Sequence, residues 1–376
     1  MNLPEWVVDF RHSAGGRVVF GPGKIDTLGA EVRRLGAMKA LIVTDPGLAR
    51  TGFVERALSA LGSQGVEGAV FAEVHENPTT EDVDRCVAFA EEEAIEVIIG
   101  LGGGSSLDTA KGCNFILSNG GRMQDYWGVG KATKPMLPFI AVPTTSGTGS
   151  ECQSFALIAD AETHAKMACG DPKCAAVVAI LDPELTVTMP VAVTAHTGID
   201  AIAHALETAV CNKRNEVSAA YARAAWRLLD AGLSRVLDDP RDLEARARML
   251  LGAAFAGTAI ENSMLGIAHS CANPLTAHFG TVHGQAVGTM LPHVIAFNRR
   301  DAEAAAIYDS LHEGDLADRV RAHLAACSMD LSLHDLGVDE TLIPRLAEEA
   351  AGQWTARFNP VPVDAALLEG VYREAW

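Results

Sequence analysis

The second half of the chain contains a carboxylate and an imidazole spaced to bind the same divalent metal ion. Asp200 and His204 lie four positions apart in TAHTGIDAIAHALETAV, residues 194–210, whose apolar residues recur at helical spacing. Side chains four positions apart project from one face of a helix. His196 would extend this row by one more turn. Because carboxylate and imidazole ligands suit Fe(II) or Zn(II), this helix face is a candidate metal site.

Further histidines could complete the ligand set. His269 lies in a second helical run, IAHSCANPLTA, and His283 precedes a glycine in TVHGQAV. One carboxylate and three imidazoles would leave room for a substrate oxygen. However, a histidine in an apolar helix is usually a packed one, and His278 and His293 lie in the same region. Spacing alone therefore does not decide which of these histidines bind metal.

A glycine-rich segment in the first half predicts a phosphate-binding loop. GLGGGSSLDTAK, residues 100–111, follows an apolar strand and enters a helix. Glycines let the backbone approach a ligand closely, and the amides of a helix start attract phosphate. The segment departs from the dinucleotide fingerprint G-x-G-x-x-G because Leu107 stands at the last glycine position. A structural turn is the alternative, and Asp108 and Lys111 either take part in binding or are solvated.

A second polar loop and a strand-terminal acid strengthen the prediction of a nucleotide site. PTTSGTGSE, residues 143–151, follows another strand and offers the hydroxyls of Thr144, Thr145, Ser146 and Thr148. Ligands bind outside the carboxyl ends of parallel strands, so two such loops favour one site. Asp45 ends the strand KALIVTD, where an acid can accept hydrogen bonds from an adenosine ribose and would repel a 2′-phosphate, which favours NAD over NADP. A turn-forming Asp-Pro-Gly is the alternative.

The elements that must position these residues divide the chain into an α/β half and a helical half. Short apolar runs alternate with helical stretches up to about residue 185, which predicts a doubly wound parallel sheet. The expected strands include RVVF, KALIV, EGAVF, EVIIG, PFIAV and VVAIL. From about residue 190 the sequence is alanine- and leucine-rich at helical spacing. We therefore expect a nucleotide-binding domain at 1–185 and a helical metal-binding domain at 186–376.

Composition narrows the classes of partner and location. The formal charge of −18 over 376 residues leaves no basic surplus for phosphates, which argues against a nucleic-acid partner. The stretch MNLPEWVVDF lacks the basic and apolar regions of a signal peptide, and no run is long enough to span a membrane. The eight cysteines contain no C-x-x-C pair, so buried free thiols and a cytoplasmic location are expected.

Taken together, these segments resemble the iron-dependent, or group III, alcohol dehydrogenase family. GGGSSLDTAK, PTTSGTGSE, DPELTVTMP, TGIDAIAHALE and the H-x13-H-G spacing occur in the family's order, and the likeness runs from FGPGK at residue 20 to LPHVIAFN at 298. The resemblance implies a dehydroquinate synthase-like fold, with a Rossmann-like α/β domain followed by an all-α domain. It also implies Fe(II), with Zn(II) as the alternative ion, NAD, and a homodimer in which the amino-terminal strand often takes part.

The resemblance also assigns roles to individual positions. The implied metal ligands are Asp200, His204, His269 and His283. The implied nucleotide contacts are Asp45, Asn77, Gly102, Gly103, Gly104, Ser105, Asp108, Thr144, Thr145, Thr148 and Lys166.

The chain departs from the family pattern at a position near the nicotinamide. The family's second helix usually reads H-x-x-x-H-P, whereas here it reads His269-Ser-Cys-Ala-Asn273-Pro274. An amide cannot exchange protons near neutral pH, so Asn273 is expected to contact substrate or cofactor only. Protons would then leave through solvent, the ribose hydroxyls or His278. Ile260, Gln153 and Phe155 are expected to reshape the substrate pocket.

These features predict an NAD(H)-dependent oxidoreductase that interconverts a small primary or secondary alcohol and its aldehyde or ketone. A reductase of an oxo-acid, of the maleylacetate reductase type, is the alternative, although no arginine flanks the metal motifs. Sugar-phosphate cyclases resembling dehydroquinate synthase share the fold, but they carry a different ligand set. A noncatalytic nucleotide- or metal-binding protein would have to keep a complete ligand set without using it.

Overall fold

The computed structural model describes residues 9–11 and 16–376, which form two compact units. Unit 1 contains the described residues through Thr145 together with Gly149–Met189, and unit 2 contains Ser146–Thr148 and Pro190–Trp376. Most of the amino-terminal stretch that we expect to carry no signal peptide lies outside the described residues. No helix in the described part of the chain has the length and hydropathy needed to cross a bilayer.

Within the described residues, unit 1 is built on a seven-stranded sheet of order β1-β2-β10-β7-β5-β3-β4. All neighbouring strands are parallel except the edge pair β1 and β2. Its strands are β1 (Asp9–Arg11), β2 (Arg17–Phe20), β3 (Lys39–Val43), β4 (Glu67–Phe71), β5 (Val97–Gly102), β7 (Phe139–Pro143) and β10 (Val178–Leu181). The parallel α/β fold expected from the alternating sequence pattern is confirmed.

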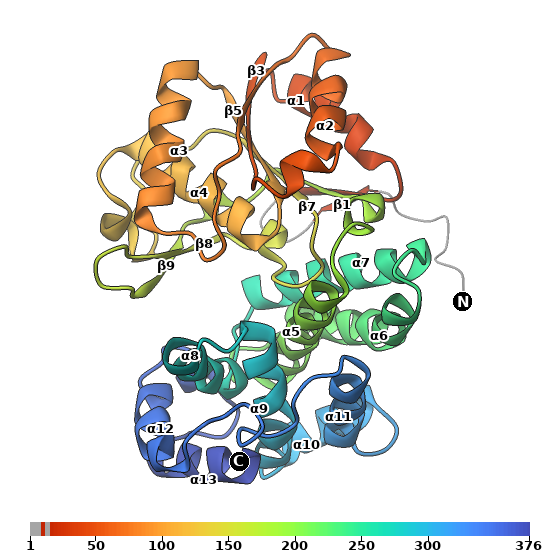
Figure 1. Ribbon diagram of the computed structural model, residues 1–376, viewed down its shortest axis with the longest axis vertical. Coiled ribbons are helices and arrows are strands. Elements are labelled where there is room, and N and C mark those ends of the chain that lie inside the picture. The colour runs from red at the N-terminus through yellow and green to blue at the C-terminus, as the bar shows by residue number, and fades with distance from the viewer. Residues whose placement is uncertain (1–8, 12–15) are drawn as a thin grey trace. The chain divides into compact units, whose positions relative to one another are not determined.

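Both faces of this sheet are buried, which explains why its strands are continuous apolar runs. In β3, Leu41 and Val43 enter one core cluster while Ala40 and Ile42 enter the cluster on the opposite face. Helices α1 (Leu28–Arg34) and α2 (Phe53–Gly62) cover the second face, and α3 (Thr80–Glu93) and α4 (Gly104–Asn119) cover the first (Figure 1). The period-two alternation of strand side chains therefore fills two separate helix–sheet layers.

A smaller sheet of order β6-β9-β8 packs beside α4. It consists of β6 (Gly128–Val129), β8 (Phe155–Ala159) and β9 (Lys166–Gly170), and β8 and β9 form an antiparallel hairpin. The hairpin continues directly from the polar loop at 143–151, through the short 3-10 turn Ser150–Cys152. The end of the polar loop is therefore joined to the small sheet through β8.

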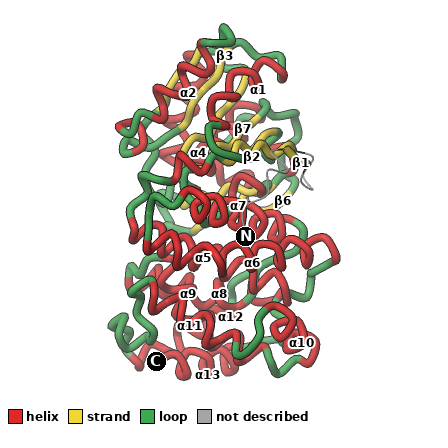
Figure 2. Tube along the Cα trace, turned by 90° about the vertical axis from the view of Figure 1, so that its right-hand side faces the viewer, coloured by secondary structure: helices red, strands yellow, loops and turns green. Residues whose placement is uncertain are grey.

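The described part of unit 2 is helical, and the strands are confined to unit 1 (Figure 2). Its helices are α5 (Val191–Val210), α6 (Glu216–Asp238), α7 (Leu243–Glu261), α8 (Ile267–Phe279), α9 (His283–Asn298), α10 (Ala302–Leu311), α11 (Leu316–Ala326), α12 (Ile343–Ala351) and α13 (Ala365–Ala375). Side chains of Asn215 and Asp242 cap α6 and α7 by accepting hydrogen bonds from first-turn amides. Helix α5 is buried continuously from Gly198 to Val210, so the unit packs around it.

Candidate metal and nucleotide sites

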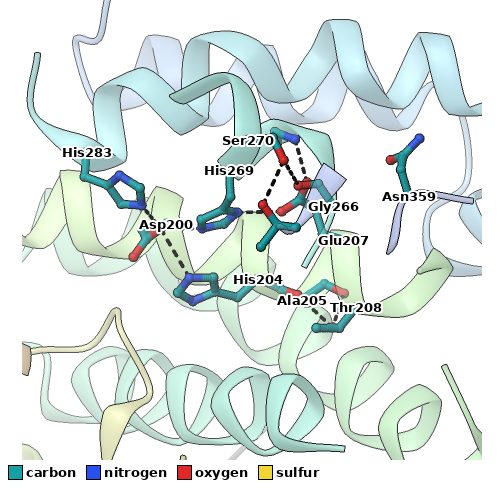
Figure 3. Close-up of polar contacts among 12 residues, drawn as sticks. Asp200, His204, Ala205, Glu207, Thr208, Gly266, His269, Ser270, His283 and Asn359 are labelled. Carbon is teal, nitrogen blue, oxygen red and sulfur yellow. Dashed lines mark hydrogen bonds and ion pairs between the residues drawn. The ribbon is translucent and has the colours of Figure 1, made fainter. Parts of the chain in front are cut away.

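In unit 2, one carboxylate oxygen lies at the centre of three imidazoles (Figure 3). Asp200 Oδ1 is 3.4 Å from His204 Nε2, 3.3 Å from His269 Nε2 and 3.8 Å from His283 Nε2. Ligand atoms at about 2.1 Å from one ion in tetrahedral or octahedral geometry lie roughly 3.0–3.4 Å apart. The separations to His204 and His269 lie within this range, and the separation of 3.8 Å to His283 is slightly wider. These side chains are therefore candidates to share an ion.

Three of the four residues also have ligand atoms that all lie close to one another. The ligand atoms of Asp200, His269 and His283 all lie within 4.8 Å of one another. His204 meets the same carboxylate oxygen, and its ring stacks on that of His269 with centroids 4.8 Å apart. One oxygen and three nitrogens form the donor set that Fe(II) and Zn(II) accept, so the residues fit such an ion.

Three helices position this set. Asp200 and His204 occupy adjacent turns of α5, His269 lies in the first turn of α8, and His283 is the first residue of α9. Helix α9 approaches α5 unusually closely, because a Cβ atom on Gly284 would lie 2.1 Å from the backbone oxygen of His196. The residue after His283 must therefore be glycine for the two helices to reach this separation.

Burial and charge divide the cluster into a closed side and an open side. Asp200, His204 and His269 are buried, whereas the His283 side chain is 36% exposed. Burial opposes ionisation of Asp200, but the three histidines outweigh it and hold the pKa of that carboxyl well below its usual value. Burial likewise opposes protonation of His269, yet Glu207 and Asp200 raise its pKa to about 9. A metal ion would displace that proton when it binds.

Glu207 is a residue of this site that the sequence did not single out. Its Oε2 lies 2.5 Å from His269 Nδ1, and its Oε1 accepts a hydrogen bond from the backbone N–H of Ala268 at 2.6 Å (Figure 3). An ionised carboxylate can only accept, so it fixes the proton on Nδ1 and leaves Nε2 as the ligand atom. The signal available in the sequence was its place three residues after His204 on the same helix.

In unit 1, the glycine-rich segment forms the turn between β5 and α4. Gly102 has φ +154°, and a Cβ atom there would lie 2.3 Å from Ser106 Oγ, so no other residue fits without rearrangement. Gly103, Gly104 and Ser105 are partly exposed at the start of α4, where no side chain caps the helix. Their amides and the positive end of the helix are therefore available to an anion.

Within unit 1, the start of the polar loop at 143–151 lies against the glycine-rich turn. The backbone N–H of Thr144 donates to the Gly102 carbonyl at 2.9 Å. A Cβ atom on Gly103 would lie 3.3 Å from Thr145 Cγ2. Thr144 is buried and Thr145 half-buried, whereas Thr148 groups with unit 2. The structure thus brings Thr144 and Thr145 to the start of α4.

Asp45 forms the Asp-Pro-Gly turn that was the alternative to ribose binding, and it also faces the glycine-rich turn. Its Oδ1 accepts hydrogen bonds from the N–H groups of Gly47 and Leu48, both at 2.9 Å. Its Oδ2 lies 3.6 Å from the Cβ position of Gly102. The turn therefore uses one oxygen and aims the other at the loop.

The remaining candidate residues have more varied surroundings. Asp108 and Lys111 are buried, which corrects the alternative that they are solvated. Asn77 and Lys166 are exposed, Asn77 with φ +53°. In α8, the Asn273 amide donates to Gln353 Oε1 at 3.1 Å, and His278 Nε2 lies 2.7 Å from Glu349 Oε2.

Comparison with known families identifies two matching family models. The model described as iron-containing alcohol dehydrogenase matches residues 15–183, and the C-terminal model of the Fe-containing alcohol dehydrogenase family matches residues 194–376. Among curated relatives, alcohol dehydrogenase 4 of Schizosaccharomyces pombe is 32% identical over 95% of this chain and 87% of its own length. The NAD-dependent methanol dehydrogenase of Bacillus methanolicus is 38% identical over 74% of each chain.

The chain is also similar in structure to solved enzymes. A 1,3-propanediol oxidoreductase matches with a TM-score of 0.91 and 32% identity, covering 96% of this chain and 97% of the other. A maleylacetate reductase from Agrobacterium tumefaciens matches with a TM-score of 0.83 and 26% identity, covering 98% of this chain and 97% of the other. Both similarities extend over nearly the whole chain.

Proposed function

Because this chain belongs to the iron-containing alcohol dehydrogenase family, we propose that it interconverts a small primary or secondary alcohol and its aldehyde or ketone with NAD(H). The observation that carries the proposal is the Asp200 carboxylate, whose Oδ1 lies 3.3–3.8 Å from three imidazole nitrogens. A cluster with these separations and this donor set is what a divalent ion requires. The family membership supplies the class of reaction.

Asp200, His204, His269 and His283 would hold Fe(II), with Zn(II) as the alternative ion. When bound, the metal supplies a Lewis acid for the substrate's oxygen, and NAD supplies the acceptor for hydride. Asp200 contributes the negative charge of the set, and the buried Glu207 keeps His269 in the tautomer that presents Nε2. The exposed side of His283 leaves the cluster accessible to a small substrate.

The proposed nucleotide site uses the loops of unit 1. The start of α4 would bind phosphate through its amides, and the second oxygen of Asp45 would accept from a ribose hydroxyl. The proposed contacts are Asp45, Asn77, Gly102, Gly103, Gly104, Ser105, Asp108, Thr144, Thr145, Thr148 and Lys166. Asn273 is proposed to contact substrate or cofactor without exchanging a proton.

His278 is the proposed proton acceptor. It lies nine residues beyond His269 on α8, or about 14 Å along the helix axis at 1.5 Å per residue. A relay through it therefore requires intervening water or hydroxyl groups. Its Nε2 lies 2.7 Å from Glu349 Oε2.

The proposal is tested with metal-free protein reloaded separately with Fe(II) and Zn(II). NADH absorbance is followed against a panel of small alcohols and aldehydes. We expect metal-dependent turnover that is lost in His269→Ala. Folded, metal-loaded protein with no turnover on any member of the panel would contradict the proposal.

An oxo-acid substrate is the second candidate, because a maleylacetate reductase is among the similar solved structures. Adding an oxo-acid to the same panel separates the two. Reduction of the oxo-acid at a kcat/KM far above that of every neutral aldehyde would favour this alternative.

We further propose that the protein is a cytoplasmic homodimer with a domain boundary at 185/186. All eight cysteines lie within the described residues and are free thiols, which suits a reducing compartment. Sedimentation equilibrium tests the dimer, since a mass near that of one 39.6 kDa chain would contradict it.

A further inference from the structure

A fully buried lysine in unit 1 has no role in the function proposed so far. Lys111 lies on α4 with none of its surface exposed. Its Nζ donates to the backbone oxygens of Ser150, Gln153 and Phe155 at 2.7, 2.8 and 2.8 Å, and it lies 2.8 Å from Ser150 Oγ. Burying an ammonium is costly unless its hydrogen bonds are satisfied, and here four oxygens surround it.

A second buried side chain, one turn earlier on α4, binds the same segment. Asp108 Oδ1 accepts a hydrogen bond from Ser150 Oγ at 2.7 Å, and its Oδ2 accepts from the backbone N–H of Leu157 at 3.2 Å. Ser150 Oγ is therefore shared by the carboxylate and the ammonium. Together these two side chains fasten the segment 150–157 to α4 over its whole length.

The position of α4 gives this fastening a consequence for the nucleotide loops. The helix begins with the glycine-rich turn, and the segment 150–157 is the continuation of the polar loop. That loop is already joined to the turn at its start, where the Thr144 N–H donates to the Gly102 carbonyl. Thus α4 holds the polar loop at its beginning through Gly102 and at its end through Asp108 and Lys111.

The oxygens that surround Lys111 show why a lysine is needed here. Three of them are backbone oxygens: Ser150 lies in the 3-10 turn, Gln153 follows that turn, and Phe155 is the first residue of β8. An apolar residue of similar length at position 111 would fill the space, but it would leave the buried Asp108 without its neighbouring positive charge. It would also remove the donor that draws these oxygens toward one point. The arrangement therefore determines the shape of the loop in addition to filling the core.

We propose that Lys111 and Asp108 are positioning residues that hold the loop at 144–155 in the conformation that binds NAD. They act through Ser150 and the backbone, and they fasten the end of the second loop to the helix that begins with the first loop. This inference rests on the proposed NAD site. It adds Lys111 as a residue that sets affinity without touching the nucleotide, and it gives Asp108, already among the proposed contacts, a second role in holding the loop.

The test uses Ser150→Ala and Lys111→Met in the full-length, metal-loaded protein. Ser150→Ala removes the shared hydroxyl and is the milder change, so it keeps the test valid if Lys111→Met folds poorly. NADH binding is measured by fluorescence titration, and KM for NAD is compared with kcat. We expect the Kd for NADH and the KM for NAD to rise about tenfold, since the loss of a hydrogen bond worth about 1.4 kcal/mol changes an equilibrium constant tenfold, with a smaller effect on kcat.

Two matched variants control for a general loss of stability. Ser118→Ala removes a hydroxyl at the other end of α4 that contacts Asn114 and Leu137. Lys173→Met removes a lysine that donates to Ala132 and Asp171 elsewhere in unit 1. Both should lower the melting temperature without changing the Kd for NADH.

The outcomes separate this inference from the proposed function. Unchanged NADH affinity in folded Ser150→Ala and Lys111→Met, or equal weakening in the two controls, would overturn the positioning role alone. Failure of the wild-type protein to bind NADH with either metal would overturn the NAD site itself, and the positioning role with it.

Discussion

Replacing Glu207 with glutamine changes one atom but should disrupt the metal site. The carboxylate accepts from two donors, His269 Nδ1 at 2.5 Å and the Ala268 N–H at 2.6 Å. A glutamine amide has only one oxygen. If that oxygen faces Ala268, the amide NH2 donates to Nδ1, and the proton of His269 moves to Nε2, the atom that faces Asp200. If the amide is reversed, two donors oppose each other at Ala268.

The size of the effect follows from these contacts. Loss of a carboxylate that orients a histidine ligand typically weakens metal binding by about 10- to 100-fold, which corresponds to about 1.4–2.8 kcal/mol. The mismatched buried donor adds about 1–3 kcal/mol of destabilisation to the metal-free protein. Glu207→Ala should weaken metal binding about as much, because it also removes the carboxylate oxygen that accepts from His269 Nδ1.

The assay is a Zn(II) titration of metal-free protein in competition with a chromophoric chelator. Asp230→Asn is the control, because Asp230 forms an equivalent pair with the buried His323 at 2.8 Å outside the metal cluster. It should lower the melting temperature and leave the Kd for Zn(II) unchanged. A folded Glu207→Gln variant that binds Zn(II) within about twofold of wild type, under about 0.5 kcal/mol, would refute the tautomer argument.

Three further predictions concern the glycine-rich turn, a buried acid and the proton route. Gly102 has φ +154°, and an added Cβ would lie 2.3 Å from Ser106 Oγ, so Gly102→Ala should lose about 1–3 kcal/mol of stability and weaken NADH binding. The control is Gly120→Ala, which has a positive φ but open space around the added Cβ and should lose stability only. Equal NADH affinity in the two variants would contradict a role of the glycine-rich turn in NADH binding. Burial raises the pKa of Glu151 from 4.5 to about 7, so ionisation favours the unfolded state and stability falls between these pH values. Relative to Glu151→Gln, urea melts of the wild type should lose up to about 3 kcal/mol from pH 4.5 to 8, and parallel curves would contradict this. His278→Asn should alter the pH dependence of kcat if His278 accepts the proton, and an unchanged profile would remove it from the route.

The sequence predicted those parts of the site whose geometry is local. Asp200 and His204 share a helix face, so their spacing alone made them candidates. His269 and His283 lie on other helices, and only the order of the family's motifs distinguished them from neighbouring histidines. Glu207 was missed because its partner, His269, is 62 residues away and no local pattern records that contact.

The fold was predictable to a similar extent. Apolar runs bounded by turns indicated the strands of the parallel sheet, since both of its faces are covered by helices. The β8–β9 hairpin was not predicted, because its two strands follow each other without an intervening helical stretch and β9, Lys166–Gly170, begins with an exposed lysine. The burial of Lys111 could not be predicted, because a lysine on a helix is normally solvated and its partners belong to a loop about 40 residues away.

The contact between Gly284 and the His196 backbone has a consequence for which ions the protein can accept. Where two helices meet backbone to backbone, as at Gly284 and His196, side-chain repacking cannot bring the helices closer together. Gly288, one turn later on α9, is also tightly packed, but against the side chains of Ile199 on α5 and Leu324 on α11. The backbone contact between α5 and α9 therefore limits how closely His283 and Asp200 can approach each other. Fe(II) and Zn(II), which have similar radii and accept imidazole ligands, would both fit between these two residues, whereas Ca(II), which takes about six to eight oxygen ligands, would be disfavoured by the three imidazoles.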